Sequence, residues 1–115
     1  MSLKGVLGSG LLMAVLLLLP QVSAAQSGIA GVVRDTSGAV LPGVTVEASS
    51  SALIEQVRSV VTSASGQYNI VDLRPGLYTV TFTLQGFATT RHQGIELPAT
   101  FTATVNAEMR VGAIE

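Results

Sequence analysis

Apolar and polar residues alternate one by one through much of the chain beyond residue 28, with the period of two that is typical of β-strands. The two clearest runs are residues 78–84 and 101–110. In the first run, Tyr78 and Phe82 share one side while threonines occupy the other. In the second run, the apolar positions begin at Phe101 and recur at every second residue. Each run predicts a half-buried strand with one face toward a core.

Shorter β-rich segments fill the rest of the chain, and no helical period occurs between them. They are residues 29–34, 44–48, 56–62, 68–71 and 87–97, the last of which we expect to be interrupted at Gly94. Seven short strands at a spacing of about 8–12 residues predict a single β-sandwich.

Glycine, proline and aspartate mark the turns between these segments. The side chain of Asp35 can accept a backbone N–H two residues further on. In a Pro-Gly pair, proline fixes φ and glycine adopts the left-handed conformation. The residues expected to shape turns are Asp35, Gly38, Pro42, Gly43, Gly66, Pro75 and Gly76. The aromatic residues expected in the core are Tyr68, Tyr78, Phe82 and Phe101.

Residues 1–25 have the layout of a secretory signal peptide, with a helical apolar segment. Lys4 is followed by a mostly apolar run at residues 6–19, and small residues end the segment. Cleavage is expected before Gln26, with the bond after Ala24 as the second choice. The apolar run is shorter than the roughly 20 residues that a spanning helix needs.

The exported chain would consist of one domain at residues 26–110 and the start of a linker at residues 111–115. It has no cysteine, which excludes disulfides and a lipid anchor through cysteine. Five arginines and seven carboxylates are scattered singly over it, so no basic stripe indicates nucleic acid. We expect no membrane span in the mature chain, and a location in the periplasm, at the outer membrane or outside the cell.

The sequence contains little that indicates catalysis. His92 is the single histidine, and no G-x-S-x-G motif, ligand cluster or phosphate loop accompanies it. We therefore expect no catalytic residue, no metal and no cofactor. A hydrolase would require a carboxylate and a hydroxyl within hydrogen-bond reach of His92.

The turn motifs together resemble the carboxypeptidase regulatory-like domain family over about residues 27–108. The motifs are Gly31-x-Val33-x-Asp35-x-x-Gly38-x-x-Leu41-Pro42-Gly43-Val44-x-Val46, Thr62-x-x-x-Gly66-x-Tyr68, Leu73-x-Pro75-Gly76-x-Tyr78-x-Val80 and Gly86-Phe87. One departure is Ser63, where the family often has an acidic residue. A serine can still bond the backbone of the turn, but a calcium or acidic site becomes less favoured.

The resemblance implies a non-catalytic, seven-stranded antiparallel Greek-key sandwich of the transthyretin-like, immunoglobulin-like kind. A signal peptide directly before such a domain looks like the front of an Oar-like TonB-dependent outer-membrane receptor. This implies docking through loops at one end of the sandwich, or through strand addition at an exposed edge. The partner would be a receptor barrel in the same chain or another cell-envelope protein. The alternative is a glycan-binding module, which would need two exposed aromatic rings side by side.

Overall fold

The structure is a computed structural model that describes residues 26–54 and 56–112. The predicted signal peptide and most of the predicted linker lie outside these residues. No helix that could cross a membrane occurs within the described part of the chain.

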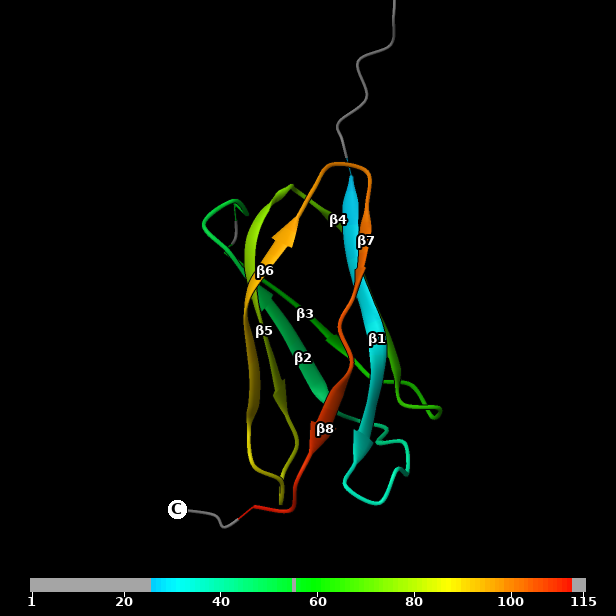
Figure 1. Cartoon of the computed structure of the whole chain (residues 1–115). Coiled ribbons are helices and arrows are strands. Elements are labelled where there is room, and N and C mark those ends of the chain that lie inside the picture. Colours follow the sequence, from blue (N-terminus) through cyan, green and yellow to red (C-terminus); the bar gives the residue numbers. More distant parts are fainter. Residues whose placement is uncertain (1–25, 55, 113–115) are drawn as a thin grey trace, which may run out of the picture.

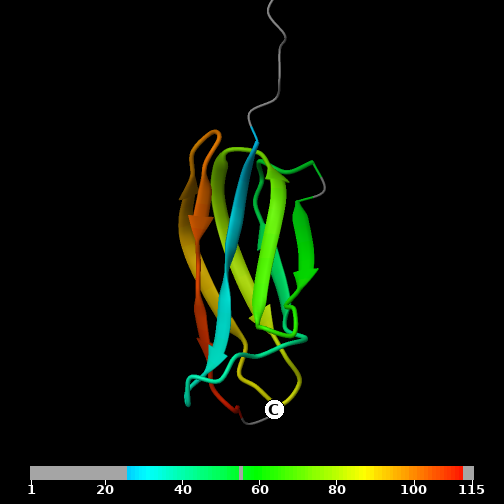
Figure 2. The same cartoon turned by 90° about the vertical axis from the view of Figure 1, so that its right-hand side faces the viewer.

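Two four-stranded sheets pack face to face (Figures 1 and 2). The first has the order β4-β1-β7, and β8 pairs with β1 further along the same side. Its strands are β1 (Ser27–Asp35), β4 (Gln67–Leu73), β7 (Thr102–Thr104) and β8 (Ala107–Met109). The second has the order β3-β2-β5-β6. Its strands are β2 (Thr45–Ser49), β3 (Val57–Val61), β5 (Gly76–Thr83) and β6 (Thr90–Leu97). The predicted all-β sandwich is therefore confirmed for the described residues.

The core lies between the sheets and contains the inward-facing side chains that the alternation identifies. Tyr78 is 1% exposed and Phe82 is fully buried, both on the inner face of β5. The ring of Tyr68 on β4 packs edge-on against Phe82, with ring centroids 5.7 Å apart, so an aromatic pair links the two sheets.

Phe101 was expected in this core, and that expectation is wrong because its side chain is 50% exposed. The residue precedes β7 in a loop where Thr100 has a positive φ. Its carbonyl accepts the N–H of Gly28, but its side chain has left the alternating pattern. A period of two constrains which way a side chain points only while the chain stays in the pleated conformation.

The expectation of seven strands is also wrong, because residues 101–110 form two strands and not one. The ladder with β1 stops at Val105 and Asn106 and resumes at Ala107. At the break, the side-chain oxygen of Asn106 accepts the N–H of Val32 at 2.9 Å, in place of a backbone carbonyl.

The sheet that contains β1 is mixed rather than antiparallel. β1 is antiparallel to β4 but parallel to both β7 and β8. β1 is the first strand in the sequence and β7 and β8 are the last two, so no hairpin turn connects them or determines their direction.

Gly94 produces a bulge in β6 and does not interrupt the strand. Tyr78 pairs with Ile95 and Val80 pairs with His92, so one residue of β5 faces two residues of β6. Gly94 has a φ of 73°, the left-handed conformation that glycine adopts in such a bulge.

The Pro75-Gly76 turn differs from the prediction. The residue with positive φ next to this turn is Asp72, at 59°, near the end of β4, while Gly76 already belongs to β5. Gly76 is needed for a different reason. A Cβ atom there would lie 2.7 Å from the Cβ of Ala52, so the absence of a side chain allows the neighbouring loop to approach.

The inward direction of Phe82 can be tested against its outward neighbour. Phe82→Ala should lower the free energy of unfolding by about 3–5 kcal/mol, because it leaves a cavity between the sheets. Thr81→Ala, on the opposite face of β5, should cost less than about 1 kcal/mol. Chemical denaturation of both variants measures the difference, and equal losses would contradict the assigned faces.

The role of Gly76 can be separated from that of a turn glycine by a double variant. Gly76→Ala should destabilise the domain by about 1–3 kcal/mol through overpacking against Ala52. Ala52→Gly in the same chain should recover most of this loss, because it removes the atom that the new Cβ meets. Thermal denaturation of the two single variants and the double variant gives the coupling energy. A coupling energy of zero would show that crowding is not the cause.

Candidate functional site

Most of the predicted turn residues gather at one end of the sandwich. Asp35 ends β1, Gly38, Pro42 and Gly43 lie in the connection from β1 to β2, and Gly66 lies between β3 and β4. The connections pack together, since a Cβ on Gly66 would lie 2.8 Å from the Cβ of Val40. Pro75 and Gly76 lie at the opposite end, which Figure 1 shows as the upper one.

The turn after β1 forms around the carboxylate of Asp35. One carboxylate oxygen accepts the backbone N–H of Ser37 at 2.8 Å and of Ala39 at 3.1 Å, and the hydroxyl of Ser37 at 2.6 Å. The bond from the Ser37 hydroxyl is the main cause of a lowered pKa for Asp35, and the two backbone bonds act in the same direction. Gly38 has a φ of 91°, as predicted for this position.

The turn between β3 and β4 repeats this arrangement with a serine. The N–H of Ser63 donates to the carbonyl of Gln67, and its carbonyl accepts the N–H of Gly66. The hydroxyl of Ser63 accepts the N–H of Gln67 at 3.3 Å. The serine therefore still bonds the turn backbone, as expected, but it adds no charge.

Thr62 connects the two turns, and sequence reasoning did not identify this role. Its buried hydroxyl donates to the carbonyl of Leu41 at 2.7 Å and accepts the N–H of Val44 at 2.9 Å. The hydroxyl thus bridges the two residues that flank Pro42 and Gly43. The separation of about 20 residues between the partners leaves no local signal in the sequence.

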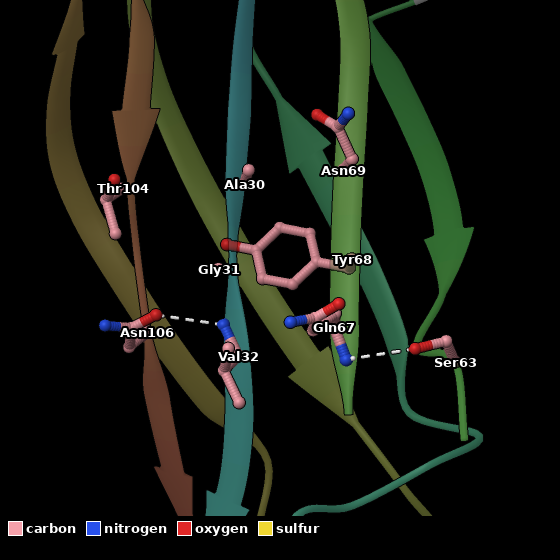
Figure 3. A pocket seen from close by; sticks show the side chains of 9 residues that line it. All are labelled: Ala30, Gly31, Val32, Ser63, Gln67, Tyr68, Asn69, Thr104 and Asn106. Atoms are coloured by element: carbon pink, nitrogen blue, oxygen red, sulfur yellow. Dashed lines mark hydrogen bonds between the residues drawn. The ribbon is translucent and has the colours of Figure 1, made fainter. Parts of the chain in front are cut away.

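An open groove of about 520 Å³ crosses the outer face of the first sheet (Figure 3). The side chains of Gln67 and Asn69 border it on β4, and Thr104 and Asn106 border it on the side of β7. Small residues of β1, among them Ala30, lie between these borders. Amides and hydroxyls can both donate and accept hydrogen bonds, so this lining suits a neutral polar ligand.

The shape of the groove depends on Gly31 and Tyr68. The two residues are opposite each other in the β1–β4 register. The phenol of Tyr68 donates to the carbonyl of Val105 on the far side of β1. A Cβ on Gly31 would lie 2.0 Å from that same carbonyl oxygen. Burial raises the pKa of Tyr68, so the phenol keeps its proton and acts as a donor at neutral pH.

A second depression, of about 600 Å³, lies over the second sheet near its β2–β3 connection. Its polar lining includes Ser49, Thr79 and Gln93, and its apolar lining includes Leu77 and Val57. The described residues that line the two depressions carry no charged side chain.

His92 lies on β6 and packs edge-on against Phe82, with ring centroids 5.7 Å apart. Its Nε2 is buried and has no hydrogen-bond partner among the described residues. Within residues 26–54 and 56–112, no three histidine, aspartate or glutamate side chains form a group that could hold a metal ion. Among the described residues, neither a carboxylate nor a hydroxyl is hydrogen-bonded to this Nε2.

A family model described as the carboxypeptidase regulatory-like domain matches residues 28–110. The chain belongs to this family. The match covers the turns bonded by the Asp35 carboxylate and the Ser63 hydroxyl, the groove, and all eight strands except the first residue of β1. A comparison with curated proteins finds no match.

Solved structures with the same fold as this regulatory-like domain come from several kinds of protein. The Bacillus anthracis TIE protein is 19% identical, with a TM-score of 0.61 over 76% of this chain and 17% of that chain. The 3-chlorocatechol 1,2-dioxygenase of Rhodococcus opacus is 12% identical, with a TM-score of 0.60 over 78% of this chain and 61% of that chain. A candidate carbohydrate-binding protein of Bacteroides uniformis is 12% identical, with a TM-score of 0.57 over 72% of this chain and 40% of that chain. The regulatory-like domain thus spans less than two thirds of each of these chains, and the likeness shows the fold alone.

The hydrogen bonds of Asp35 predict an acid-dependent stability of the regulatory-like domain. Because the folded state lowers the pKa of this carboxyl, its charge stabilises the fold above the unfolded pKa, and the effect is lost as the pH falls through the folded pKa. Asp35→Asn keeps an acceptor oxygen but removes the charge. The stability difference between parent and variant should be constant near neutral pH and shrink below about pH 4. Urea denaturation from pH 7 to pH 2 measures it, and a difference that is independent of pH would contradict the role of the charge.

Proposed function

We propose that this chain is an exported, non-catalytic accessory domain of a TonB-dependent outer-membrane receptor, present as its N-terminal domain or as a fragment of it. The observation that carries the proposal is the order of segments. A family match over residues 28–110 follows directly after a segment with the pattern of a signal peptide. The domain would work in the periplasm or at the outer membrane.

The distribution of loops supports a docking or spacing role. The turns around Asp35 and Ser63 lie at the same end as the last strand, β8 (Figure 1). Backbone bonds also hold the segment after β8 there, since the N–H of Ala88 donates to the carbonyl of Arg110 and that of Gly112 donates to the carbonyl of Gly86. The end of the sandwich at which the described chain finishes therefore carries several loops held by hydrogen bonds.

The polar chemistry also supports a role without catalysis. The phenols of Tyr68 and Tyr78 both donate to backbone carbonyls, those of Val105 and Arg74. The ring of His92 packs edge-on against that of Phe82, and its buried Nε2 has no hydrogen-bond partner among the described residues. The two phenols bond to the fold itself, and among the described residues that line the two depressions Tyr68 is the one ionisable side chain.

Export and partner can be tested together in an envelope fraction. The tagged chain, expressed from its full coding sequence in a bacterium with an outer membrane, should lose about 25 residues and appear in the periplasmic or outer-membrane fraction. Leu17→Arg interrupts the apolar run and should leave the chain unprocessed in the cytoplasm. Chemical crosslinking in the native host should then capture a TonB-dependent barrel. An unprocessed cytoplasmic parent chain would refute the proposal.

A second candidate function is binding of a glycan in the amide-lined groove. The observation that favours it is the set of neutral donors and acceptors on Gln67, Asn69 and Thr104. The two exposed aromatic rings side by side that a glycan-binding module would need are not present among the described residues. Of the five aromatic residues, all of which are described, Phe101 alone is exposed. A glycan would therefore be held chiefly by hydrogen bonds.

Site-directed variants on a glycan array can test this second function. A glycan bound by the parent should lose at least about tenfold in affinity with Gln67→Ala or Asn69→Ala, since each removes a bond to a neutral partner. Gln93→Ala, an amide lining the other depression, is the matched control and should leave binding unchanged. Equal effects of all three variants, or no binding by the parent, would exclude this groove as a glycan site.

A further inference from the structure

The sandwich has two edges on each sheet, and three of these four edges are protected against further strand pairing. The edge at β6 carries the Gly94 bulge and the exposed charged side chains of Arg91 and Glu96. The edge at β7 and β8 consists of two three-residue strands interrupted at Asn106. Bulges, charges and short strands are the devices by which natural sheets avoid edge-to-edge association.

The third protected edge is β4, and the protecting residue comes from β3. The guanidinium of Arg58 donates to the carbonyl of Val71 at 3.1 Å and to that of Asp72 at 3.4 Å. These bonds occupy the end of the β4 edge. They also direct the one charged side chain of β3 toward the other sheet and away from its own free edge.

The remaining edge, β3, has no such protection. It forms one margin of the sandwich, on the right in Figure 2. Val57 is 44% exposed and Val61 is 62% exposed, and both lie on its outer face. The five-residue strand contains no proline, glycine or bulge, and it pairs with β2 residue by residue over its whole length.

The register shows which backbone groups of β3 are available. The N–H of Thr62 donates to the carbonyl of Val44, and the N–H of Ser50 donates to the carbonyl of Gln56. Bonded pairs alternate along an antiparallel ladder, so the even-numbered residues of β3 face β2. The N–H and C=O groups of Val57, Ser59 and Val61 therefore point outward from the sheet.

We propose that β3 pairs with β3 of a second copy of this chain, antiparallel and about a two-fold axis at Ser59. In this register Val57 lies opposite Val61 of the other copy, and Ser59 lies opposite its own equivalent. The three outward residues supply about six backbone hydrogen bonds across the seam. The result is one continuous sheet of eight strands, made by a closed, isologous contact.

The pattern of side chains is the reason that the occupant is a second copy. The outer face of β3 reads valine, serine, valine, which is unchanged when the strand is reversed. Glu47 lies opposite Ser59 on β2, so three strand spacings, about 14 Å, would separate the two copies of this carboxylate. This separation exceeds the Debye length of about 8 Å at physiological salt, so the repulsion is largely screened.

Analytical ultracentrifugation tests the pairing by measuring the mass of the particle in solution. The chain is expressed from its full coding sequence and purified after any cleavage that occurs in the cell. A contact of five residues is below the size of stable interfaces, so a reversible dimer is expected at about 0.1 mM protein. Val61→Lys should weaken dimerisation at least about tenfold, because it replaces both apolar cross-strand pairs by a lysine opposite a valine. The matched control is Val71→Lys, on an exposed valine of the β4 edge, and it should leave dimerisation unchanged.

A cysteine at the two-fold axis provides an independent measurement that does not depend on affinity. The chain has no cysteine of its own. Residues in a hydrogen-bonded antiparallel pair have Cα atoms about 5.5 Å apart, within the range that a disulfide spans. Ser59→Cys should therefore form a disulfide-linked dimer on mild oxidation, while Ser65→Cys, in the exposed turn, should not do so at the same concentration.

A dimer that Val61→Lys weakens and that Ser59→Cys links by a disulfide supports pairing at β3. A chain that stays monomeric up to about 1 mM overturns it, and so does a monomer that instead pairs β3 with an extended peptide of another protein. A dimer that ignores Val61→Lys and fails to crosslink through Ser59→Cys associates through another surface and also overturns the proposal. The pairing would be the same whether or not the domain precedes a receptor barrel.

Discussion

The phenol of Tyr68, which passes over Gly31 to the carbonyl of Val105, is the contact on which the rest of the sandwich depends. Its single hydrogen bond joins β4 to the β7–β8 break across β1, while the ring packs against Phe82 of the other sheet. A buried hydroxyl without a partner would be costly, so the bond and the core support each other. The glycine is required because any side chain there would occupy the position of the carbonyl oxygen. The groove on the outer face exists because β1 is built from small residues at this crossing.

A second, smaller network gives one end of the domain its shape. The carboxylate of Asp35 and the hydroxyls of Ser63 and Thr62 each satisfy backbone groups that a loop would otherwise leave to water. The β1–β2 and β3–β4 connections are thereby tied into one unit by hydrogen bonds. Such preorganised loops lose little conformational freedom when another surface meets them, which is the physical advantage of a docking module.

Much of this architecture could be predicted from short-range patterns, and most of the features that could not be predicted depend on long-range contacts. Alternation was sufficient to place Tyr78 and Phe82 in the core, and local turn chemistry was sufficient for Asp35 and Gly38. Gly76 was predicted to be required for a left-handed turn, but it is required because a side chain there would meet Ala52 of the β2–β3 connection. The parallel pairing of β1, the split at Asn106 and the bridging hydroxyl of Thr62 join residues 18–74 positions apart. The groove could not be predicted either, because its lining comes from three strands whose order the sequence does not state.

The parallel pairing of the first strand with the last two has a mechanical consequence. β1 begins at one end of the sandwich, and β8 finishes at the other (Figure 1). A pull applied between the two ends of the described chain would drag β1 and β8 in opposite directions along their length. The bonds between them would then be loaded together in shear, not opened one after another from a hairpin end. The domain would transmit tension along its long axis and resist extension until many bonds broke at once.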